Sequence, residues 1–320
     1  DALDWDDFPI TWYPLAEIMH VKQALEPGAN LLHHQRPNNQ MCEGFVERGD
    51  LQQAWQLSEI TKTVEINTSF VEHAYIEPEA GMARMVSGRL QVYGCTQAPY
   101  MDRASLAGIL ALNEADIQII PSAVGGGFGS KLDLSFQPYV ALATLMLQQP
   151  VRMTYSRAES MSSTTKRHPA NIQLKAGVDA QGLLTGMEFT GTFNTGAYAS
   201  WGPTVANRVP VHASGPYNWP SYRAICQGVH THSVPAGAFR GFGVPQAAIA
   251  QEMVFDQLAN SMNLDRLEFR LRNALDQGVA TVTGQKFDGS VGIKACLNAL
   301  HQPWEKALKQ VRNQNQEAVR

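Results

Sequence analysis

The sequence predicts an α+β protein in which helices pack on mixed sheets. Strand-like and helix-like segments follow one another without a regular βαβ alternation, and this order favours α+β over a parallel α/β fold. The chain has 320 residues and is 44% hydrophobic, which is ample for the core of one large or two ordinary domains. Its 26 glycines, 17 prolines and low charged fraction of 17% indicate many loops and much buried surface.

The elements can be expected in chain order. Residues 1–58 are rich in Pro, Asn, Gln and His with weak periodicity, which predicts an extended connector that follows a missing N-terminal domain. Alternating β-branched runs after it predict strands, and apolar residues at helical spacing predict helices. We expect strands over 59–70, 88–97, 116–124 and 150–157, helices over 101–113 and 136–149, and a hairpin over 170–196 that turns at 179–182.

The last third of the chain is expected to be helical. Two helices are predicted, over 245–263 after Pro245 and over 264–275, and a C-terminal helical segment follows over 289–320. The domain between connector and C-terminal segment then covers residues 59–288, as two α+β lobes.

Charge and cysteine content exclude several classes of protein. The net charge is −4 and no Lys/Arg run stands out, so we expect no nucleic-acid partner. The four cysteines form no CxxC pair, which excludes zinc-ribbon and iron–sulfur spacings from this chain. Their even number leaves disulfides open. The acidic, aromatic start and the lack of a long apolar run predict a cytoplasmic protein with free thiols and no membrane partner.

The run GGGFGSKL, residues 125–132, requires an explanation because glycine carries an entropic cost. It is not a GxGxxG motif, since the sixth residue is Ser130 or Leu132. It is not a P-loop either, because Ser130 precedes Lys131 and Leu132 follows it. Two interpretations remain. The run is either a strand-to-helix turn or a loop whose N–H groups meet an anion or a bulky cofactor.

Two further motifs carry charged side chains. AFRGFGVPQ, residues 238–246, places Arg240 where it can donate two hydrogen bonds to a phosphate or oxo ligand, or pair with a core carboxylate. HAYIEP, residues 73–78, holds His73 and Glu77 four apart. Pro78 argues against the helix that would make them metal ligands, so a satisfied buried polar pair is expected.

Three other loops have weaker signals. Gln97 in CTQAPY follows a strand end, where an amide can point into a site or simply belong to a loop. SSTTKRHPA, residues 162–170, is polar, and its Lys166–His168 run could be only a solvated face. NTGAYASWGP, residues 194–203, combines small and aromatic residues, and Arg208 follows shortly after it.

In this order, the motifs HAYIEP, TQ, GGGFGSK, KRHP, GAYASWGP and AFRGFGVPQ resemble the molybdopterin-binding subunit of the xanthine dehydrogenase and aldehyde oxidase family, over about residues 5–300. The stretches GGGFGSKLDLS, SSTTKRHP, GAYASWGP and GAFRGFGVPQA resemble the nicotinate dehydrogenases more narrowly. The resemblance implies that residues 59–288 form the first molybdopterin-binding domain of the molybdenum hydroxylases.

The resemblance also implies a reaction and its cofactors. Family members add a water-derived oxygen to a carbon beside a ring nitrogen, or to an aldehyde carbon. The cofactor is molybdenum–molybdopterin, plain or as the cytosine dinucleotide, and the metal is held by the pterin dithiolene rather than by protein ligands. Electrons leave through [2Fe–2S] clusters to FAD, which are expected on partner chains or domains.

The family's site residues map onto this chain. Gln97, Phe128 and Arg240 match residues at the metal centre. Phe242 matches an aromatic residue that stacks on substrate, and Arg208 matches an arginine that orients it and could hold a carboxylate. The cofactor-binding set is Gln97, Gly126, Gly127, Phe128, Gly129, Ala238, Phe239, Arg240 and Gly241.

Two departures from the family pattern matter. Leu132 stands where the xanthine enzymes carry a purine-binding glutamate, so a small nicotinate-like N-heteroaromatic is expected as substrate. An aldehyde, xanthine or hypoxanthine, and a non-enzymatic anion- or partner-binding module, remain alternatives. The catalytic glutamate of the family's GxGE motif is not in this chain. We therefore expect a second molybdopterin subunit or C-terminal half, an iron–sulfur subunit and an FAD subunit, and no activity from the chain alone.

Overall fold

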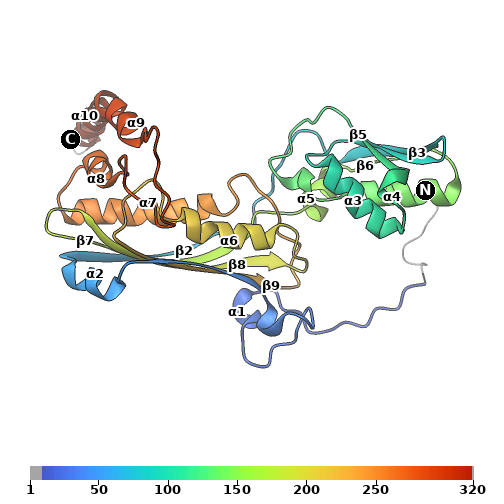
Figure 1. Cartoon of the computed structure of the whole chain (residues 1–320), viewed down its shortest axis with the longest axis horizontal. Coiled ribbons are helices and arrows are strands. Elements are labelled where there is room, and N and C mark those ends of the chain that lie inside the picture. The colour runs from blue at the N-terminus through green and yellow to red at the C-terminus, as the bar shows by residue number, and fades with distance from the viewer. Residues whose placement is uncertain (1–8, 319–320) are drawn as a thin grey trace.

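A computed structural model describes residues 9–318, which form two lobes side by side (Figure 1). Residues 1–8 of the predicted connector and residues 319–320 of the C-terminal segment lie outside the described residues. The small lobe, made of residues between β2 and β7, is inserted into the large lobe.

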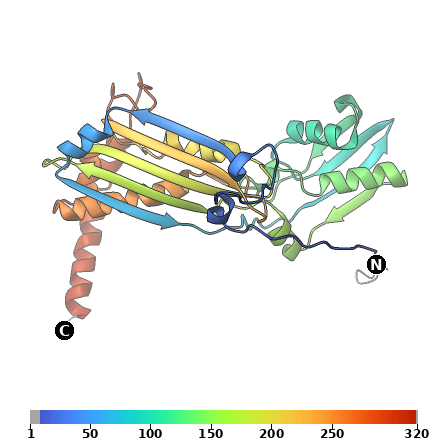
Figure 2. The same cartoon turned by 90° about the horizontal axis from the view of Figure 1, so that it is seen from below.

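The large lobe is built on a five-stranded mixed sheet in the order β1-β9-β8-β7-β2 (Figure 2). Its only parallel neighbours among the described strands are β8 and β9, and the other three pairs are antiparallel. The sheet places the predicted hairpin at its centre, with the turn at Asp179–Gly182. The strands are β1 (Gln40–Arg48), β2 (Ile60–Asn67), β7 (Ala170–Val178), β8 (Leu184–Gly196) and β9 (Ser221–His230).

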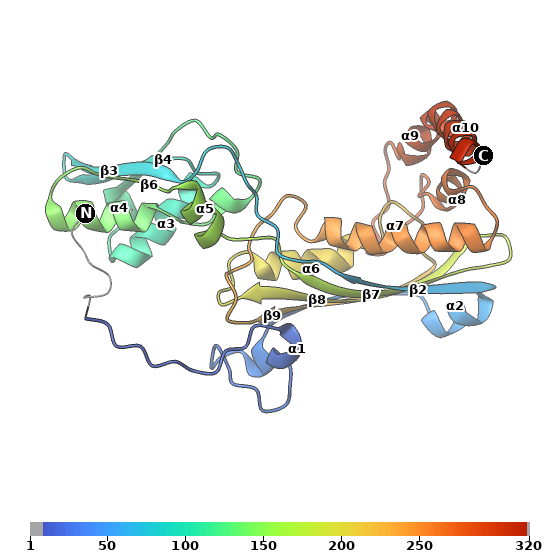
Figure 3. The same ribbon diagram turned by 180° about the vertical axis from the view of Figure 1, so that it is seen from behind.

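Helices cover both faces of this sheet (Figure 3). One face carries α6 (Gly202–His212) and α7 (Val244–Ser261), and the other carries α1 (Val21–Ala24) and α2 (Leu51–Leu57). Because both faces are covered, β8 is buried along most of its length. The core packs aromatic rings of α7 and α8 against the sheet, with Phe255 edge-on to Phe269 at 5.3 Å. Beyond α7 lie α8 (Arg266–Asn273), α9 (Ile293–Ala299) and α10 (His301–Ala318).

The small lobe has a four-stranded sheet in the order β5-β4-β3-β6. Helices α3 and α4 pack on it, and their apolar sides close a core around Phe136, Leu106 and Val92. The elements are β3 (Ala80–Val86), β4 (Arg89–Gly94), α3 (Pro99–Leu110), β5 (Ile117–Pro121), α4 (Gln137–Leu147), β6 (Val151–Thr154) and α5 (Arg157–Ser163). Short 3₁₀ turns lie at Pro37–Asn39, Glu114–Asp116 and Ser130–Leu132.

The α+β class with mixed sheets and packed helices is confirmed. The extended connector expected over 1–58 contains regular structure in its last part. Residues 40–48 form the edge strand β1, and residues 51–57 form α2. Pairing with β9, which lies far away in sequence, makes residues 40–48 a strand, so local periodicity could not reveal it. None of the described helices has the length and apolarity needed to cross a membrane.

Candidate functional site

The glycine loop, residues 125–129, connects β5 to the 3₁₀ turn at Ser130–Leu132. Gly126 and Gly129 have φ angles of 103° and 110°. A Cβ on Gly125 or Gly126 would lie 2.5 Å or 2.9 Å from a Cβ of the HAYIEP segment. A Cβ on Gly127 would lie 2.4 Å from Gln97 Oε1, and one on Gly129 would lie 2.6 Å from Ala238 O. The glycines are therefore required by close contacts within this chain.

Three of the predicted motifs meet at this loop. The Gly129 N–H donates to Gln97 Oε1 at 3.0 Å, and the Gln97 N–H donates to Lys131 O at 2.8 Å. From the large lobe, the Arg240 N–H donates to Phe128 O at 2.8 Å. Gln97, Phe128 and Arg240 are all exposed, and Phe128 adopts a positive φ of 52°. The structure thus brings these three residues together on one open surface at the junction of the lobes.

The HAYIEP segment supports the loop from behind. Lys131 Nζ lies 2.7 Å from Glu77 Oε2 and 4.6 Å from the ring centre of Tyr75, with only 3% of its side chain exposed. Burial opposes ionisation of Glu77, but the Lys131 ammonium and the Gly125 N–H together lower its pKa. Lys131 is therefore neutralised inside the chain and is not a free ligand for an anion.

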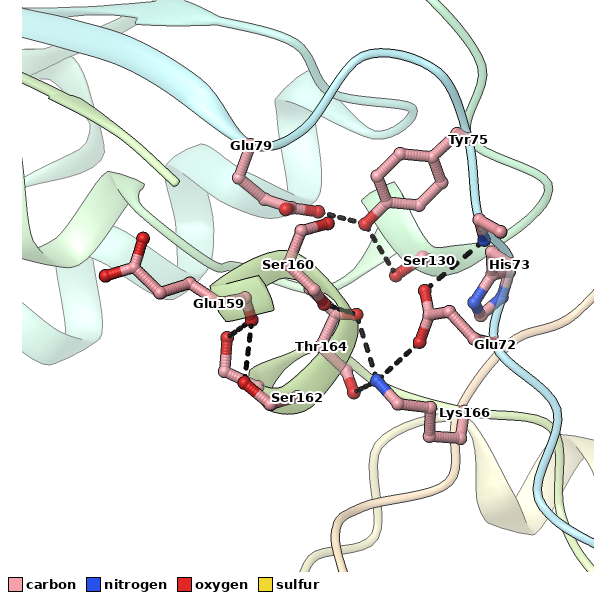
Figure 4. A network of polar contacts seen from close by, with 12 residues as sticks. Glu72, His73, Tyr75, Glu79, Ser130, Glu159, Ser160, Ser162, Thr164 and Lys166 are labelled. Carbon is pink, nitrogen blue, oxygen red and sulfur yellow. Dashed lines mark hydrogen bonds and ion pairs between the residues drawn. The ribbon is translucent and has the colours of Figure 1, made fainter. Parts of the chain in front are cut away.

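Tyr75 and Glu79 extend this support into the small lobe (Figure 4). The Tyr75 hydroxyl donates to Glu79 and lies 3.4 Å from Ser130 Oγ. Burial, reinforced by the Glu79 hydrogen bond, raises the pKa of Tyr75 to about 12, so the hydroxyl keeps its proton at neutral pH.

His73 and Glu77 do not contact each other in the way a buried polar pair would. His73 Nε2 lies 2.9 Å from Ala238 O, and its ring stacks on Phe239 at 4.0 Å. Because a carbonyl can only accept, Nε2 carries the proton and donates. His73 thus holds the AFRGFGVPQ segment, whereas Glu77 holds the glycine loop. No cluster of three or more His, Cys, Asp or Glu within residues 9–318 could hold a metal ion.

The interpretation of Lys166–His168 as a solvated face is wrong. Lys166 and His168 are buried, and Lys166 Nζ lies 2.6 Å from Glu72 Oε2, with 9% and 13% of the two side chains exposed. This run crosses from the small lobe back to the large lobe, so it is enclosed by both. A polar sequence cannot reveal that location, because only the two-lobe topology creates it.

His168 gives the chain a specific acid sensitivity. Burial, assisted by the neighbouring Arg167 charge, lowers the pKa of His168 to about 3. Below pH 6.5 the unfolded chain binds a proton at His168, whereas the folded chain does not. The free energy of unfolding therefore decreases as the pH decreases. We expect wild type to lose about 2 kcal/mol more than His168→Asn between pH 8 and pH 5. Urea unfolding at both pH values measures this difference, and parallel pH profiles would contradict it.

The predicted substrate residues lie beside the cofactor residues. The guanidinium carbon of Arg208, exposed on α6, lies 5.8 Å from the ring centre of Phe242, and Phe242 stacks on Trp201 at 6.2 Å. Leu132 and Trp201 both line a cavity of about 780 Å³ where the lobes meet. Sequence reasoning missed Trp201, although the aromatic GAYASWGP loop was a signal for it.

Several hydrogen-bond donors at this surface have no partner within the described residues. Among residues 9–318, neither Gln97 Nε2 nor the Arg240 guanidinium has a hydrogen-bond partner, and the N–H groups of Gly126, Gly127 and Phe128 have none either. Gln97 Oε1 is already used by Gly129, so the amide presents its N–H₂ group outward. A surface with these unpaired donors, including one cation, suits an anionic, oxygen-rich group such as a molybdenum cofactor.

Comparison with known proteins gives a consistent result. The family model described as "Molybdopterin cofactor-binding domain" matches residues 32–274. The chain is 37% identical over 305 residues to the nicotinate dehydrogenase large molybdopterin subunit of Eubacterium barkeri, and the match covers 95% of this chain and 71% of that protein. It is 38% identical over 265 residues to a probable xanthine dehydrogenase subunit of Bacillus subtilis, and this match covers 82% of this chain and 35% of that protein.

Solved structures show the same fold. The aldehyde oxidoreductase from Desulfovibrio gigas matches 93% of this chain with a TM-score of 0.90 and 25% identity. The quinoline 2-oxidoreductase from Pseudomonas putida matches 96% with a TM-score of 0.87 and 23% identity. The chain spans 33% and 40% of these two proteins.

Proposed function

The chain belongs to the molybdopterin cofactor-binding domain family of the molybdenum-dependent oxidoreductases, and from this premise we propose that it binds a molybdenum–molybdopterin cofactor and hydroxylates a small, nicotinate-like N-heteroaromatic together with partner chains. The observation that carries the proposal is the group of unpaired donors where the Gln97, Phe128 and Arg240 loops meet. The bound cofactor would supply two-electron redox chemistry, with water as the source of oxygen.

The residues of this chain would bind and orient the cofactor. Gln97 Nε2, the Arg240 guanidinium and the loop N–H groups donate to the anionic face of the cofactor. Phe128, exposed by 48%, covers this face and limits access of water. Gln97, Phe128 and Arg240 are each held by a backbone hydrogen bond to a neighbouring loop, so these three residues are preorganised before any ligand arrives.

The substrate would lie between the aromatic residues and the cavity. Phe242 and Trp201 offer stacking surfaces for a flat ring, and Leu132 adds an apolar contact in place of a carboxylate. Arg208 supplies a cation for a substrate carboxylate. The apolar Leu132 would also suit an aldehyde, which is the second candidate. The catalytic base, the [2Fe–2S] clusters and FAD would come from the partner chains or domains, and the cofactor could carry the cytosine dinucleotide.

Metal analysis and substrate oxidation test the proposal. The chain would be purified with the chains that co-purify with it, and molybdenum and pterin would be measured. Dye reduction would then be followed with nicotinate, hypoxanthine and benzaldehyde. We expect molybdenum in near-stoichiometric amount and fastest dye reduction with nicotinate. Absence of molybdenum would overturn the cofactor proposal, whereas oxidation of the aldehyde alone would overturn only the substrate.

Arg208→Ala is expected to weaken recognition of a carboxylate specifically. The KM for nicotinate should rise by about tenfold or more, because a hydrogen bond to a charged group is lost. The KM for the neutral nicotinamide should change little. Arg223→Ala, at an exposed arginine near the start of β9, is the control. Equal losses for the two substrates would show that Arg208 does not bind the carboxylate.

A further inference from the structure

Arg167 lies against the loop that carries Arg240. Its Nη2 donates to Arg240 O at 3.0 Å, and its Nη1 donates to Gln246 Oε1 at 3.2 Å. Its guanidinium carbon lies 3.8 Å from the ring centre of Phe239. One planar side chain therefore contacts the loop before Arg240, the backbone at Arg240 and the first turns of α7.

The segment that carries Arg167 is itself fixed on both sides. The Arg167 N–H donates to Val71 O at 3.0 Å, which joins the two chain segments that cross between the lobes. The neighbouring Lys166 exchanges backbone hydrogen bonds with Pro235 and Gly237 at 3.1 and 2.9 Å. Its ammonium lies between Glu72 and Thr164 (Figure 4). Arg167 thus extends from a rigid anchor rather than from a free loop.

The contacts of Arg167 are unusual for a half-buried cation. Its side chain forms no ion pair with any carboxylate of residues 9–318, and Glu72 is paired with the preceding residue, Lys166. Its partners are a carbonyl, an amide oxygen and an aromatic face, all neutral. A half-buried charge without a counter-charge is costly, and these neutral contacts have to compensate for that cost. The planar guanidinium makes all three of them at once.

We propose that Arg167 is a positioning residue that holds Arg240 in the orientation needed for the cofactor. The backbone of Arg240 is held at both groups, since its N–H donates to Phe128 O in the small lobe and its C=O accepts from Arg167. These two hydrogen bonds fix the direction in which the exposed Arg240 side chain leaves the loop. A lysine would keep the charge but cannot bond two acceptors while lying flat on the Phe239 ring.

The test rests on the proposed function and uses the chain with its co-purified partners. Arg167→Lys, Arg240→Lys, the double variant and the control Arg223→Lys are compared in molybdenum content and in kcat and KM for nicotinate. Arg167→Lys should lower kcat per molybdenum by about tenfold to a hundredfold, as small misplacements do, with a KM change below about threefold. The double variant should be no slower than Arg240→Lys alone, because Arg167 acts through Arg240.

A readout that needs no cofactor separates this inference from the proposed function. Hydrogen exchange of the peptide containing residues 238–243 should be faster in Arg167→Lys than in wild type and unchanged in Arg223→Lys. If molybdenum is absent from wild type, the proposed function fails and the exchange result alone decides about Arg167. Unchanged exchange, an unchanged kcat, or additive losses in the double variant would each overturn the positioning role.

Discussion

Gly129→Ala is expected to unfold the junction between the lobes and to prevent retention of the cofactor. An alanine Cβ would lie 2.6 Å from Ala238 O and 2.8 Å from Ala238 C, and the φ of 110° is strained for any side chain. Backbone atoms cannot move aside as a side-chain end can. Strain and overpacking together predict a loss of roughly 2–5 kcal/mol of unfolding free energy, measured by urea unfolding, together with loss of bound molybdenum.

Gly88→Ala is the matched control for this variant. Gly88 has a φ of 78°, but a Cβ built on it would meet no atom within 4 Å. This variant should lose only the backbone cost of about 1–2 kcal/mol and keep its molybdenum. If Gly129→Ala were no less stable than Gly88→Ala and equally loaded with metal, the contact with Ala238 would not be needed.

Lys166→Met is expected to have an effect of similar size by a different mechanism. The change leaves Glu72 buried without its cation at 2.6 Å, and breaking a buried ion pair from one side costs about 3–5 kcal/mol. Because the pair joins the two segments that cross between the lobes, the loss should appear in urea unfolding and as faster proteolysis at these crossings.

Removing the remaining charge should rescue this variant. In Lys166→Met/Glu72→Gln no buried charge is left unpaired, so most of the lost stability should return. Arg103, whose ion pair with Glu114 is exposed, offers the comparison. Arg103→Met should change the unfolding free energy by less than about 1 kcal/mol. A double variant as unstable as Lys166→Met would mean that packing of the lysine stem, not its charge, is what matters.

The sequence predicts the elements whose stability is local. The hairpin over 170–196, the helix α7 and the helix α4 lie at nearly their predicted positions, since each has an apolar pattern and a clear turn, proline or cap. The edge strand β1 and the helix α6 are not predicted. β1 exists by pairing with β9, and α6 contains Pro210 in its interior, where proline opposes helix formation.

The residues expected to contact the cofactor could be predicted from the sequence, but the residues that hold them in place could not. Gln97, Phe128 and Arg240 are selected together by a family resemblance, and they lie together in the structure. Arg167 and His73, which hold the Arg240 loop, are interpreted from the sequence as part of a solvated face and as half of a polar pair. Their partners are backbone carbonyls of residues 70 or more positions away. Because every residue has a backbone carbonyl, these contacts leave no motif in the sequence.

The inserted position of the small lobe divides the site between two exchangeable parts of the chain. The insert leaves β2 and returns to β7 at adjacent points, where the Thr68 N–H donates to Ala170 O at 2.9 Å. Segments whose ends lie this close tolerate insertion and exchange, because the strands of the host sheet need not move apart. The insert carries Gln97, Phe128 and Leu132, and the host carries Arg208, Arg240 and Phe242. A chimera that exchanges only residues 68–169 would therefore transfer one set of contacts while the other stays in place.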